Sequence, residues 1–378
     1  KSSSQFINAL HIFRYDLLKS KQRTSMIDFT HTFYEKTKNF SIFPRSSMPK
    51  NKKLLLYGPP RSGKTSIALE LANSAKKVLY IDGSDIRFRI AEAQSTLLKL
   101  FLEKRFDFLI IDNFSPNIPL PNTSNIILIT PQIAHLPESI LSTFTIQKIL
   151  PLTFQEYVSF TKKSLSLESI FSNFLKEGNI PEIPFLPEFK KLERNQEIVK
   201  LRFSQDLNIF CSLLSYQAQK FSIYNFYTIL KQHTKISKDR IYHFIQTLDE
   251  EGIIAKVPHI SANQPQKLYF YNFALPYFIS AQPNFQAIFE NLIYCELARS
   301  ATSIYYDEYC DFLVDDCVYC ATPFPTQHTI AQKLSQIQST HSTIEKIIFI
   351  TIKAQEPQTP PHHKCSIINF IDFALNDE

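Results

Sequence analysis

Long apolar runs are missing from this sequence. The longest, at residues 125–130 and 347–352, have the length of a β-strand, whereas a membrane-spanning helix needs ~20 predominantly apolar residues. Residues 1–20 carry charged and polar side chains where a signal peptide would have its apolar centre. We therefore expect a cytoplasmic protein that has no membrane partner.

Glycine is also scarce, with only five residues in a chain of 378. Two of the five, Gly58 and Gly63, lie in one short stretch between a strand-like apolar segment and a helix-like segment. Because glycine has no Cβ, it is the residue that most readily adopts the backbone angles of a tight turn. This stretch is therefore the first candidate for a functional loop.

Cysteine and net charge exclude little. Six cysteines in a chain that we expect in the cytoplasm are most simply reduced thiols. A net charge of +6 permits a nucleic-acid or acidic partner without requiring one. With 44% hydrophobic residues the chain can build real cores, and its length favours two or three domains over a single one.

The first half of the chain is predicted to contain a parallel sheet. Residues 1–50 have the pattern of a helical segment and a linker, and residues 51–160 alternate short apolar strands with helices. Four strands are expected, at 53–58, 78–83, 106–114 and 125–130. Nearly all-apolar strands that alternate with helices form parallel sheets covered on both faces. The predicted fold class of this region is α/β.

The stretch from Gly58 to Thr65 matches the phosphate-binding pattern G-x-x-x-x-G-K-[ST], with a buried strand before it and a helix after it. The glycines let successive backbone N–H groups turn inward around a phosphate. We expect Lys64 to reach the β- and γ-phosphates of ATP and the Thr65 hydroxyl to bind Mg²⁺. The residues predicted to bind nucleotide are Gly58, Pro59, Pro60, Arg61, Ser62, Gly63, Lys64, Thr65 and Ser66.

A second element of the predicted site is the end of the apolar strand FLIID. Asp112 lies there, where a P-loop protein needs a carboxylate to hold Mg²⁺. The next residue is Asn113, although many ATPases have a glutamate at this position. An amide can position a water molecule but cannot take its proton. The sequence therefore indicates nucleotide binding more firmly than hydrolysis.

The second half has a different pattern. Residues 161–202 are predicted to form a helical linker region, and residues 203–280 have the order helix, turn, helix and β-wing of a winged-helix domain. Ser237 is expected to cap a helix that stops at Gly252. Basic residues at or near that helix make DNA contact an alternative to a solvated helix face. The candidate DNA contacts are Lys235, Lys238 and Arg240.

The order of motifs resembles bacterial and archaeal AAA-type ATPases that carry a C-terminal DUF4143-type domain. The resemblance runs from about Lys52 to the low 320s. The segments that carry it are YGPPRSGKT, LYIDGSD, FLIIDNF, IILITP, LPLTFQEYVSF, EGNIPE, IFENLIYCEL and YYDEYCDFLV. It implies an AAA-like P-loop domain, then a winged helix, and then a domain with a restriction-endonuclease-like fold.

Three departures from this family bear on hydrolysis. Asn113 stands where the family usually has glutamate, and Thr130-Pro131-Gln132 replaces its usual Thr-Gly-Ser at the end of the sensor strand. An arginine that usually precedes the Pro-Leu signature is missing, and Lys148 nearby cannot fork around a phosphate as arginine does. Asn113 and Thr130 remain the candidate catalytic residues, and we expect hydrolysis to be weak or absent.

The resemblance implies a nuclease-like domain at residues 281–378. Asp311 stands at the position of the nuclease aspartate. Tyr319 and Ala321 stand where the glutamate and lysine of such enzymes would be, so we expect this domain to be inactive. A CxxC pair, Cys317 and Cys320, also invites a zinc site. The pair falls in a strand-like segment that would point the two thiols to opposite faces, which argues against zinc.

The leading hypothesis is an ATP- and Mg²⁺-binding protein that acts as a nucleotide-dependent switch. The first alternative is a DNA-binding winged-helix protein with a vestigial nucleotide site, and the second is a metal-dependent nuclease. A homo-oligomer stays open, because a neighbouring subunit could supply the arginine that the chain lacks.

Overall fold

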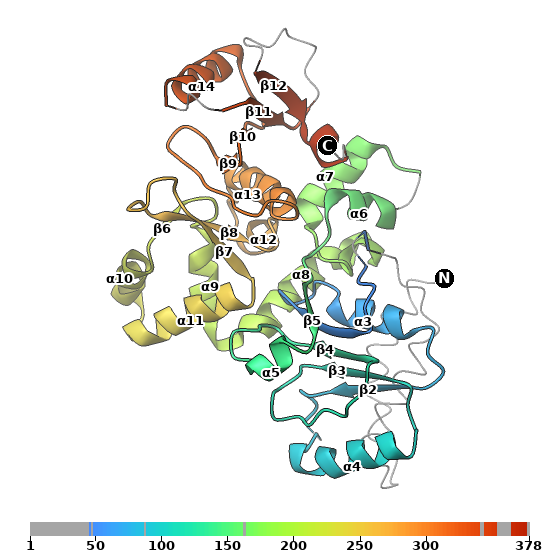
Figure 1. Ribbon diagram of the computed structural model, residues 1–378. Coiled ribbons are helices and arrows are strands. Elements are labelled where there is room, and N and C mark those ends of the chain that lie inside the picture. Colours follow the sequence, from blue (N-terminus) through green and yellow to red (C-terminus); the bar gives the residue numbers. More distant parts are fainter. Residues whose placement is uncertain are drawn as a thin grey trace. The chain divides into compact units, whose positions relative to one another are not determined.

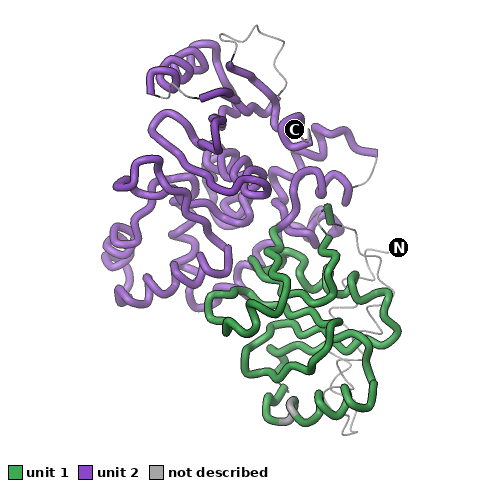
Figure 2. The backbone as a smooth tube through the Cα atoms, in the orientation of Figure 1, with its two compact units in different colours: residues 1–150 green, residues 151–378 purple. Residues whose placement is uncertain are grey.

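The computed structural model describes residues 45–46, 48–86, 88–161, 164–340, 344–353 and 364–375. The helical segment predicted within residues 1–50 lies mostly outside them. The chain divides into two compact units, residues 1–150 and 151–378 (Figure 2). The finer domain boundaries expected at 160, 202 and 280 stay predictions.

Unit 1 is built on a parallel five-stranded sheet with the strand order β2-β3-β4-β1-β5 (Figure 1). The strands are β1 (Lys53–Tyr57), β2 (Val78–Asp82), β3 (Phe108–Asp112), β4 (Ile126–Ile129) and β5 (Thr145–Lys148). The helices are α3 (Lys64–Ala72), α4 (Ile90–Leu102) and α5 (Glu138–Leu141). The α/β fold predicted for this region is confirmed, and β5 is an additional strand that the sequence analysis missed.

Alternation along the strands explains why this sheet has helices on both faces. Leu54 and Leu56 pack with α3 in one buried cluster, whereas Leu55 between them packs with α4 in another. Successive side chains of a strand point to opposite faces, so an uninterrupted apolar run needs cover on both. The missed strand β5 is the exception, since three of its four residues are exposed.

Unit 2 is richer in helices. They are α6 (Phe154–Phe160), α7 (Leu167–Glu177), α8 (Glu188–Phe203), α9 (Leu207–Leu214), α10 (Ile223–His233), α11 (Lys238–Glu250), α12 (Leu275–Ile279), α13 (Phe285–Leu297), α14 (Gln327–Thr340) and α15 (Phe370–Leu375), with 3-10 turns at Ile183–Phe185 and Ser204–Asp206. Ser237 caps α11 by accepting a hydrogen bond from the Arg240 backbone N–H, and Gly252 follows the helix with a positive φ of 70°. Both of these end signals were predicted.

Two sheets complete unit 2. One has the order β6-β8-β7 and is antiparallel, and the other has the order β12-β11-β10-β9. Their strands are β6 (Lys220–Phe221), β7 (Ile254–Val257), β8 (Gln266–Phe270), β9 (Phe312–Val314), β10 (Cys317–Ala321), β11 (Lys346–Thr351) and β12 (Cys365–Asn369). Strand β10 contains the CxxC pair, as expected. Among the described residues, no group of three or more His, Cys, Asp or Glu side chains could hold a metal ion.

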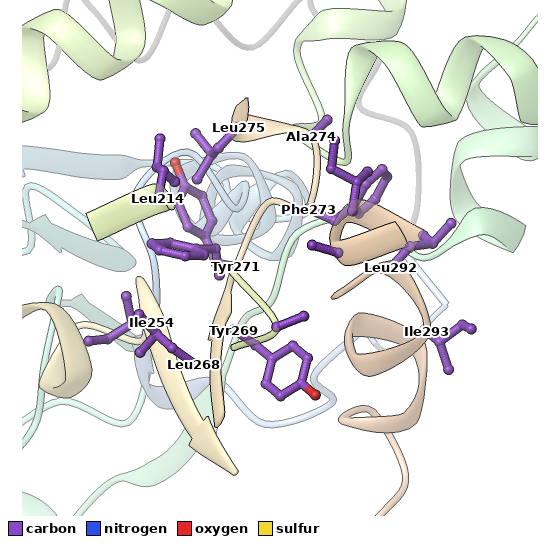
Figure 3. Packing of buried hydrophobic residues seen from close by; sticks show 14 of the residues in the cluster. Leu214, Ile254, Leu268, Tyr269, Tyr271, Phe273, Ala274, Leu275, Leu292 and Ile293 are labelled. Carbon is purple, nitrogen blue, oxygen red and sulfur yellow. The ribbon is translucent and has the colours of Figure 1, made fainter. Parts of the chain in front are cut away.

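A single large apolar cluster fills the middle of unit 2. Figure 3 shows Leu268 and Tyr269 of β8 together with Leu292 and Ile293 of α13 in this core, and all four are buried. Burial of each such side chain stabilises the fold by about 1.5–3 kcal/mol. The core therefore joins the antiparallel sheet to the helix that leads into the last sheet.

The segment PLTFQEY, singled out above by resemblance, joins three helices of unit 2. The Thr153 hydroxyl and the Glu156 carboxylate form a capping box at the start of α6. The hydroxyl of Tyr157 donates to Glu177 of α7 at 2.6 Å, and the backbone N–H of Phe154 donates to Glu296 of α13 at 2.8 Å. Its polar residues thus have a structural role within unit 2.

The described helices include none that combines the length and the apolar character needed to cross a membrane.

Candidate nucleotide-binding site

The turn between β1 and α3 adopts the backbone that its glycines allow. Gly58 has a φ of 131° and Gly63 has a φ of 95°, both in the region that side chains disfavour. A Cβ on Gly58 would lie 2.5 Å from the carbonyl oxygen of Ile149. Arg61, between them, also has a positive φ, of 61°. Glycine is therefore required at position 58 both by backbone angle and by close packing.

Lys64, the first residue of α3, reaches back over this loop. Its Nζ donates to the carbonyl oxygens of Gly58 and Pro59, each at 2.8 Å. Proline has no N–H, so the peptide groups that precede Pro59 and Pro60 offer only acceptors to the loop. The ammonium group of Lys64 thus lies at the part of the loop that cannot itself donate to a phosphate.

Thr65 and Asp112 meet at the carboxyl edge of the sheet. The Thr65 hydroxyl donates to Oδ2 of Asp112 at 2.6 Å. The same oxygen accepts a hydrogen bond from the Tyr80 hydroxyl at 2.9 Å, and Oδ1 accepts one from the backbone N–H of Asn113 at 2.9 Å. Burial raises the pKa of the Asp112 carboxyl, and the hydrogen bonds from Thr65 and Tyr80 oppose that rise.

The side chain of Asn113 is engaged in hydrogen bonds with the turn that follows β2. Its φ is 51°, in the left-handed region where asparagine is among the better-tolerated residues. Its side-chain amide donates to Oδ1 of Asp82 at 2.8 Å and to the Ser84 hydroxyl at 3.2 Å. The two turns that follow β2 and β3 are thus tied together. This link gives a physical reason for asparagine at the position where the resembled family has glutamate.

The other predicted site residues are spread around the loop. Thr130 follows β4 and is buried, and its hydroxyl donates to the backbone oxygen of Gln132 at 2.9 Å. No hydrogen bond within the described part of the chain joins Thr130 to Thr65 or Asp112. Ser62 is fully buried and its hydroxyl oxygen has no hydrogen-bond partner there, whereas Arg61 and Ser66 are exposed and Pro60 is partly so.

The candidate DNA contacts lie in unit 2, at and before the start of α11, and all three are exposed. Arg240 pairs with Asp206 at 2.5 Å, and the Lys238 ammonium lies 5.3 Å from the centre of the Tyr242 ring. Arg240 therefore already has an anionic partner within the protein. Within the described part of the chain, Lys235 makes no hydrogen bond or ion pair that would compete for it.

Two residues near the loop escaped the sequence analysis, Tyr80 and Arg45. Tyr80 pairs with Ile110 in the register of β2 and β3, which brings its hydroxyl to Asp112. A single phenol among the apolar residues of β2 was the available signal. Arg45 donates to the carbonyl oxygens of Ser62 and Leu150. These partners are 17 and 105 residues away along the chain, so no local pattern could point to them.

Residues 54–116 match the family model described as "ATPase family associated with various cellular activities (AAA)". This stretch contains the whole loop, Thr65 and Asp112, so the resemblance to AAA-type ATPases is supported for this part of unit 1.

Two solved structures are also similar. One is AMPPCP-bound DnaA from Aquifex aeolicus, with 14% identity over 61% of this chain and 90% of that one and a TM-score of 0.27. The other is katanin, from a structure on its self-assembly, with 16% identity over 48% of this chain and 73% of that one and a TM-score of 0.26. No curated protein sequence matches the chain.

Proposed function

We propose that this protein binds ATP together with Mg²⁺ at the loop between β1 and α3, and that nucleotide acts as a switch with weak or absent hydrolysis. The observation that carries the proposal is the meeting of Thr65 with Asp112 at 2.6 Å, beside a loop that Lys64 closes. The helix α3 adds the positive end of its dipole to the same place.

The oxygen donors at this position suit Mg²⁺. A hydroxyl and a carboxylate are the hard ligands that Mg²⁺ prefers in nucleotide sites. Thr65 would bind the ion directly and Asp112 would hold its water ligands. The bound ion supplies neutralisation of the phosphate charge, while Lys64 and the loop N–H groups orient the phosphates.

Slow turnover follows from the groups around Asp112. Asn113 cannot take a proton from water, and its amide is engaged with Asp82. We infer that a bound nucleotide is held more readily than it is cleaved. An arginine from a second copy of the chain would raise the rate, so the proposal includes a homo-oligomer as the state in which turnover becomes measurable.

The test is titration calorimetry with ATP and ADP in the presence of Mg²⁺, followed by phosphate release on the same sample. We expect binding with little release. Lys64→Ala should lose binding while the fold survives, and Lys76→Ala, an exposed lysine of the same unit, should not. Unchanged binding in Lys64→Ala would refute the proposed site.

DNA binding is a second candidate, favoured by the arrangement of residues 207–270. The helices α9, α10 and α11 followed by the hairpin of β7 and β8 have the order of a winged helix, and the start of α11 is exposed and basic. Reversing the charge of Lys235, Lys238 and Arg240 should weaken DNA binding and reduce its salt dependence. Equal affinity in the reversed and unaltered proteins would remove this candidate.

We also propose that residues 281–378 form a DUF4143-type domain with a nuclease-like fold and no nuclease activity. Asp311 accepts a hydrogen bond from the Ala321 backbone and lies within 4 Å of the ammonium groups of Lys267 and Lys333. These contacts compensate its charge inside the protein. A metal-dependent cleavage assay with Asp311→Ala as control should therefore find no activity to lose.

A further inference from the structure

Arg45 connects two backbone segments of unit 1 that are far apart in the sequence. Its Nη1 donates to the carbonyl oxygen of Ser62 at 3.0 Å, and its Nη2 donates to the carbonyl oxygen of Leu150 at 2.9 Å. Ser62 is in the nucleotide loop, and Leu150 is the last residue of unit 1. One planar guanidinium thus holds both segments at once, with its donors in the fixed geometry that distinguishes arginine from lysine.

The hydrogen bond to Ser62 sets the direction of the next N–H group. In a trans peptide the C=O and N–H point to opposite sides. Because the Ser62 oxygen faces Arg45, the N–H of Gly63 points away from Arg45. In phosphate-binding loops the N–H groups converge on one concave side. Arg45 therefore contacts the outer side of the Ser62–Gly63 peptide. The Gly63 N–H, on the opposite side, stays available to a phosphate in the loop.

The segment at Leu150 packs along the same loop. The backbone N–H of Ile149 donates to the Tyr57 oxygen at 2.8 Å, and the Ile149 oxygen is the atom that leaves no room for a Cβ on Gly58. The loop therefore touches residues 149–150 through Gly58 and is tied to them again through Arg45. A shift of the Ser62–Gly63 peptide would therefore move the guanidinium and strain its hydrogen bond to Leu150.

We propose that Arg45 is a positioning residue for phosphate recognition, which orients the Ser62–Gly63 peptide toward a bound phosphate and fixes it to Leu150. This inference rests on the proposed nucleotide site and deepens it by naming a residue outside the loop on which phosphate affinity depends. Arg45 itself acts through the backbone and does not contact the nucleotide.

The scarcity of glycine makes a direct test practical. Protein labelled with ¹⁵N-glycine gives amide signals from five residues, of which Gly58, Gly63 and Gly83 belong to unit 1 and Gly178 and Gly252 to unit 2. The full chain is titrated with ATP and Mg²⁺, and affinity is measured by calorimetry on the same samples. The variants are Arg45→Ala and Arg45→Lys, with Lys50→Ala as a control in the same linker.

In Arg45→Ala we expect the ATP-induced shift of the Gly63 signal to shrink and ATP affinity to fall about tenfold, the effect of one charge-assisted hydrogen bond. Arg45→Lys should recover affinity only in part, and added methylguanidinium should restore both readouts in Arg45→Ala. Unshifted Gly178 and Gly252 signals show that unit 2 stays folded, and an unshifted Gly83 signal shows the same for the β2–β3 turns.

Three results would overturn the inference, and they are distinguishable. If the unaltered protein binds ATP and Arg45→Ala binds it equally well with the same Gly63 shift, Arg45 has no positioning role and the proposed function stands. If the unaltered protein binds no ATP, both fall together. A loss of affinity that methylguanidinium does not rescue would also count against it, since that pattern indicates general destabilisation.

Discussion

Asp112 of unit 1 and the pair Glu290 and Asp311 of unit 2 are carboxylates with opposite surroundings. In unit 1 the partners of Asp112 are two neutral hydroxyls and a backbone N–H, and no Lys, Arg or His of the described residues lies within ion-pair distance of it. In unit 2 the Glu290 carboxylate lies 2.9 Å from the Lys267 ammonium, and Asp311 lies 3.6 Å from the same group and 3.7 Å from that of Lys333.

This difference distinguishes the proposed Mg²⁺ site from a structural network. Neutral donors orient a carboxylate without cancelling its charge, so Asp112 keeps an electrostatic reason to attract a cation. Glu290 and Asp311 are matched by Lys267 and Lys333 of the same unit, so the charges of this pair are already compensated. A search for buried or half-buried acidic residues alone would select Asp112 and the Glu290–Asp311 pair equally. The partners of each carboxylate, neutral donors or lysines, distinguish the two cases.

The largest effect is expected when the network of unit 2 is broken on one side. Lys267→Met leaves Glu290 buried without its close cation, which costs about 3–5 kcal/mol of the free energy of unfolding. Denaturant unfolding followed through the glycine signals of unit 2 measures the loss. ATP affinity in unit 1 should be unchanged.

Lys333→Met is the matched control for that prediction. Lys333 is more exposed, with 34% of its side chain accessible against 14% for Lys267. Its ammonium lies 3.7 Å from Asp311, whereas that of Lys267 lies 2.9 Å from Glu290. Its loss should cost no more than about 1 kcal/mol. If the two lysine variants were equally destabilised, the compensating role assigned to Lys267 would be wrong.

The second effect concerns the uncompensated carboxylate. Asp112→Asn removes the negative charge but keeps an oxygen that can accept from Thr65 and Tyr80. We expect Mg²⁺-dependent nucleotide affinity to fall about 10–100-fold, while affinity without Mg²⁺ changes little. Asp107→Asn, an exposed carboxylate of the same unit, is the control. A decrease that is the same with and without Mg²⁺ would contradict the assignment.

How far the sequence predicts this site depends on how local each contact is. The positive φ angles of Gly58 and Gly63 and the position of Asp112 follow from a motif and one apolar strand. The link from Asn113 to Asp82 spans 31 residues and depends on the pairing of β2 with β3, which a motif does not encode.

The same reasoning explains what the sequence analysis missed in the fold. Strand β5 has the sequence TIQK, and most of its side chains face solvent, so it lacks the apolar run that marked the other strands. Its place at the edge of the sheet removes the need for apolar residues on both faces. Arg45 was missed because its partners are backbone oxygens, and these carry no residue-type signal.

Glu296 of unit 2 is a carboxylate with a neutral backbone donor, and from its pKa we predict that stability depends on pH. Its carboxylate accepts from the Phe154 N–H, and burial raises its pKa to about 7 from the ordinary 4.5. The folded state therefore keeps a proton that the unfolded state releases, so the free energy of unfolding falls as pH rises through this range. Glu296 alone contributes at most about 1.4 kcal/mol per pH unit to the slope.

Glu296→Gln keeps an acceptor for Phe154 and removes the titration, so the slope between the two pKa values should flatten. Unfolding by urea at a series of pH values provides the measurement, with Glu193→Gln as an exposed control. Glu290, whose pKa burial also raises to about 7, keeps its own contribution, so an undiminished slope in Glu296→Gln is the result that would contradict the role of Glu296.

The smallest expected effect tests most directly whether the neutral donors of Asp112 compete with a bound cation. Tyr80→Phe removes one neutral donor from Oδ2 of Asp112 and leaves Thr65 in place. Loss of this buried hydrogen bond should lower the free energy of unfolding by about 1 kcal/mol. The same change leaves the carboxylate oxygen less occupied, so Mg²⁺-dependent ATP binding should tighten, by less than tenfold. Tyr57→Phe, next to the loop, is the control. If Mg²⁺ affinity weakened along with stability, Tyr80 would position Asp112 for the ion, and its donor would support cation binding instead of competing with it.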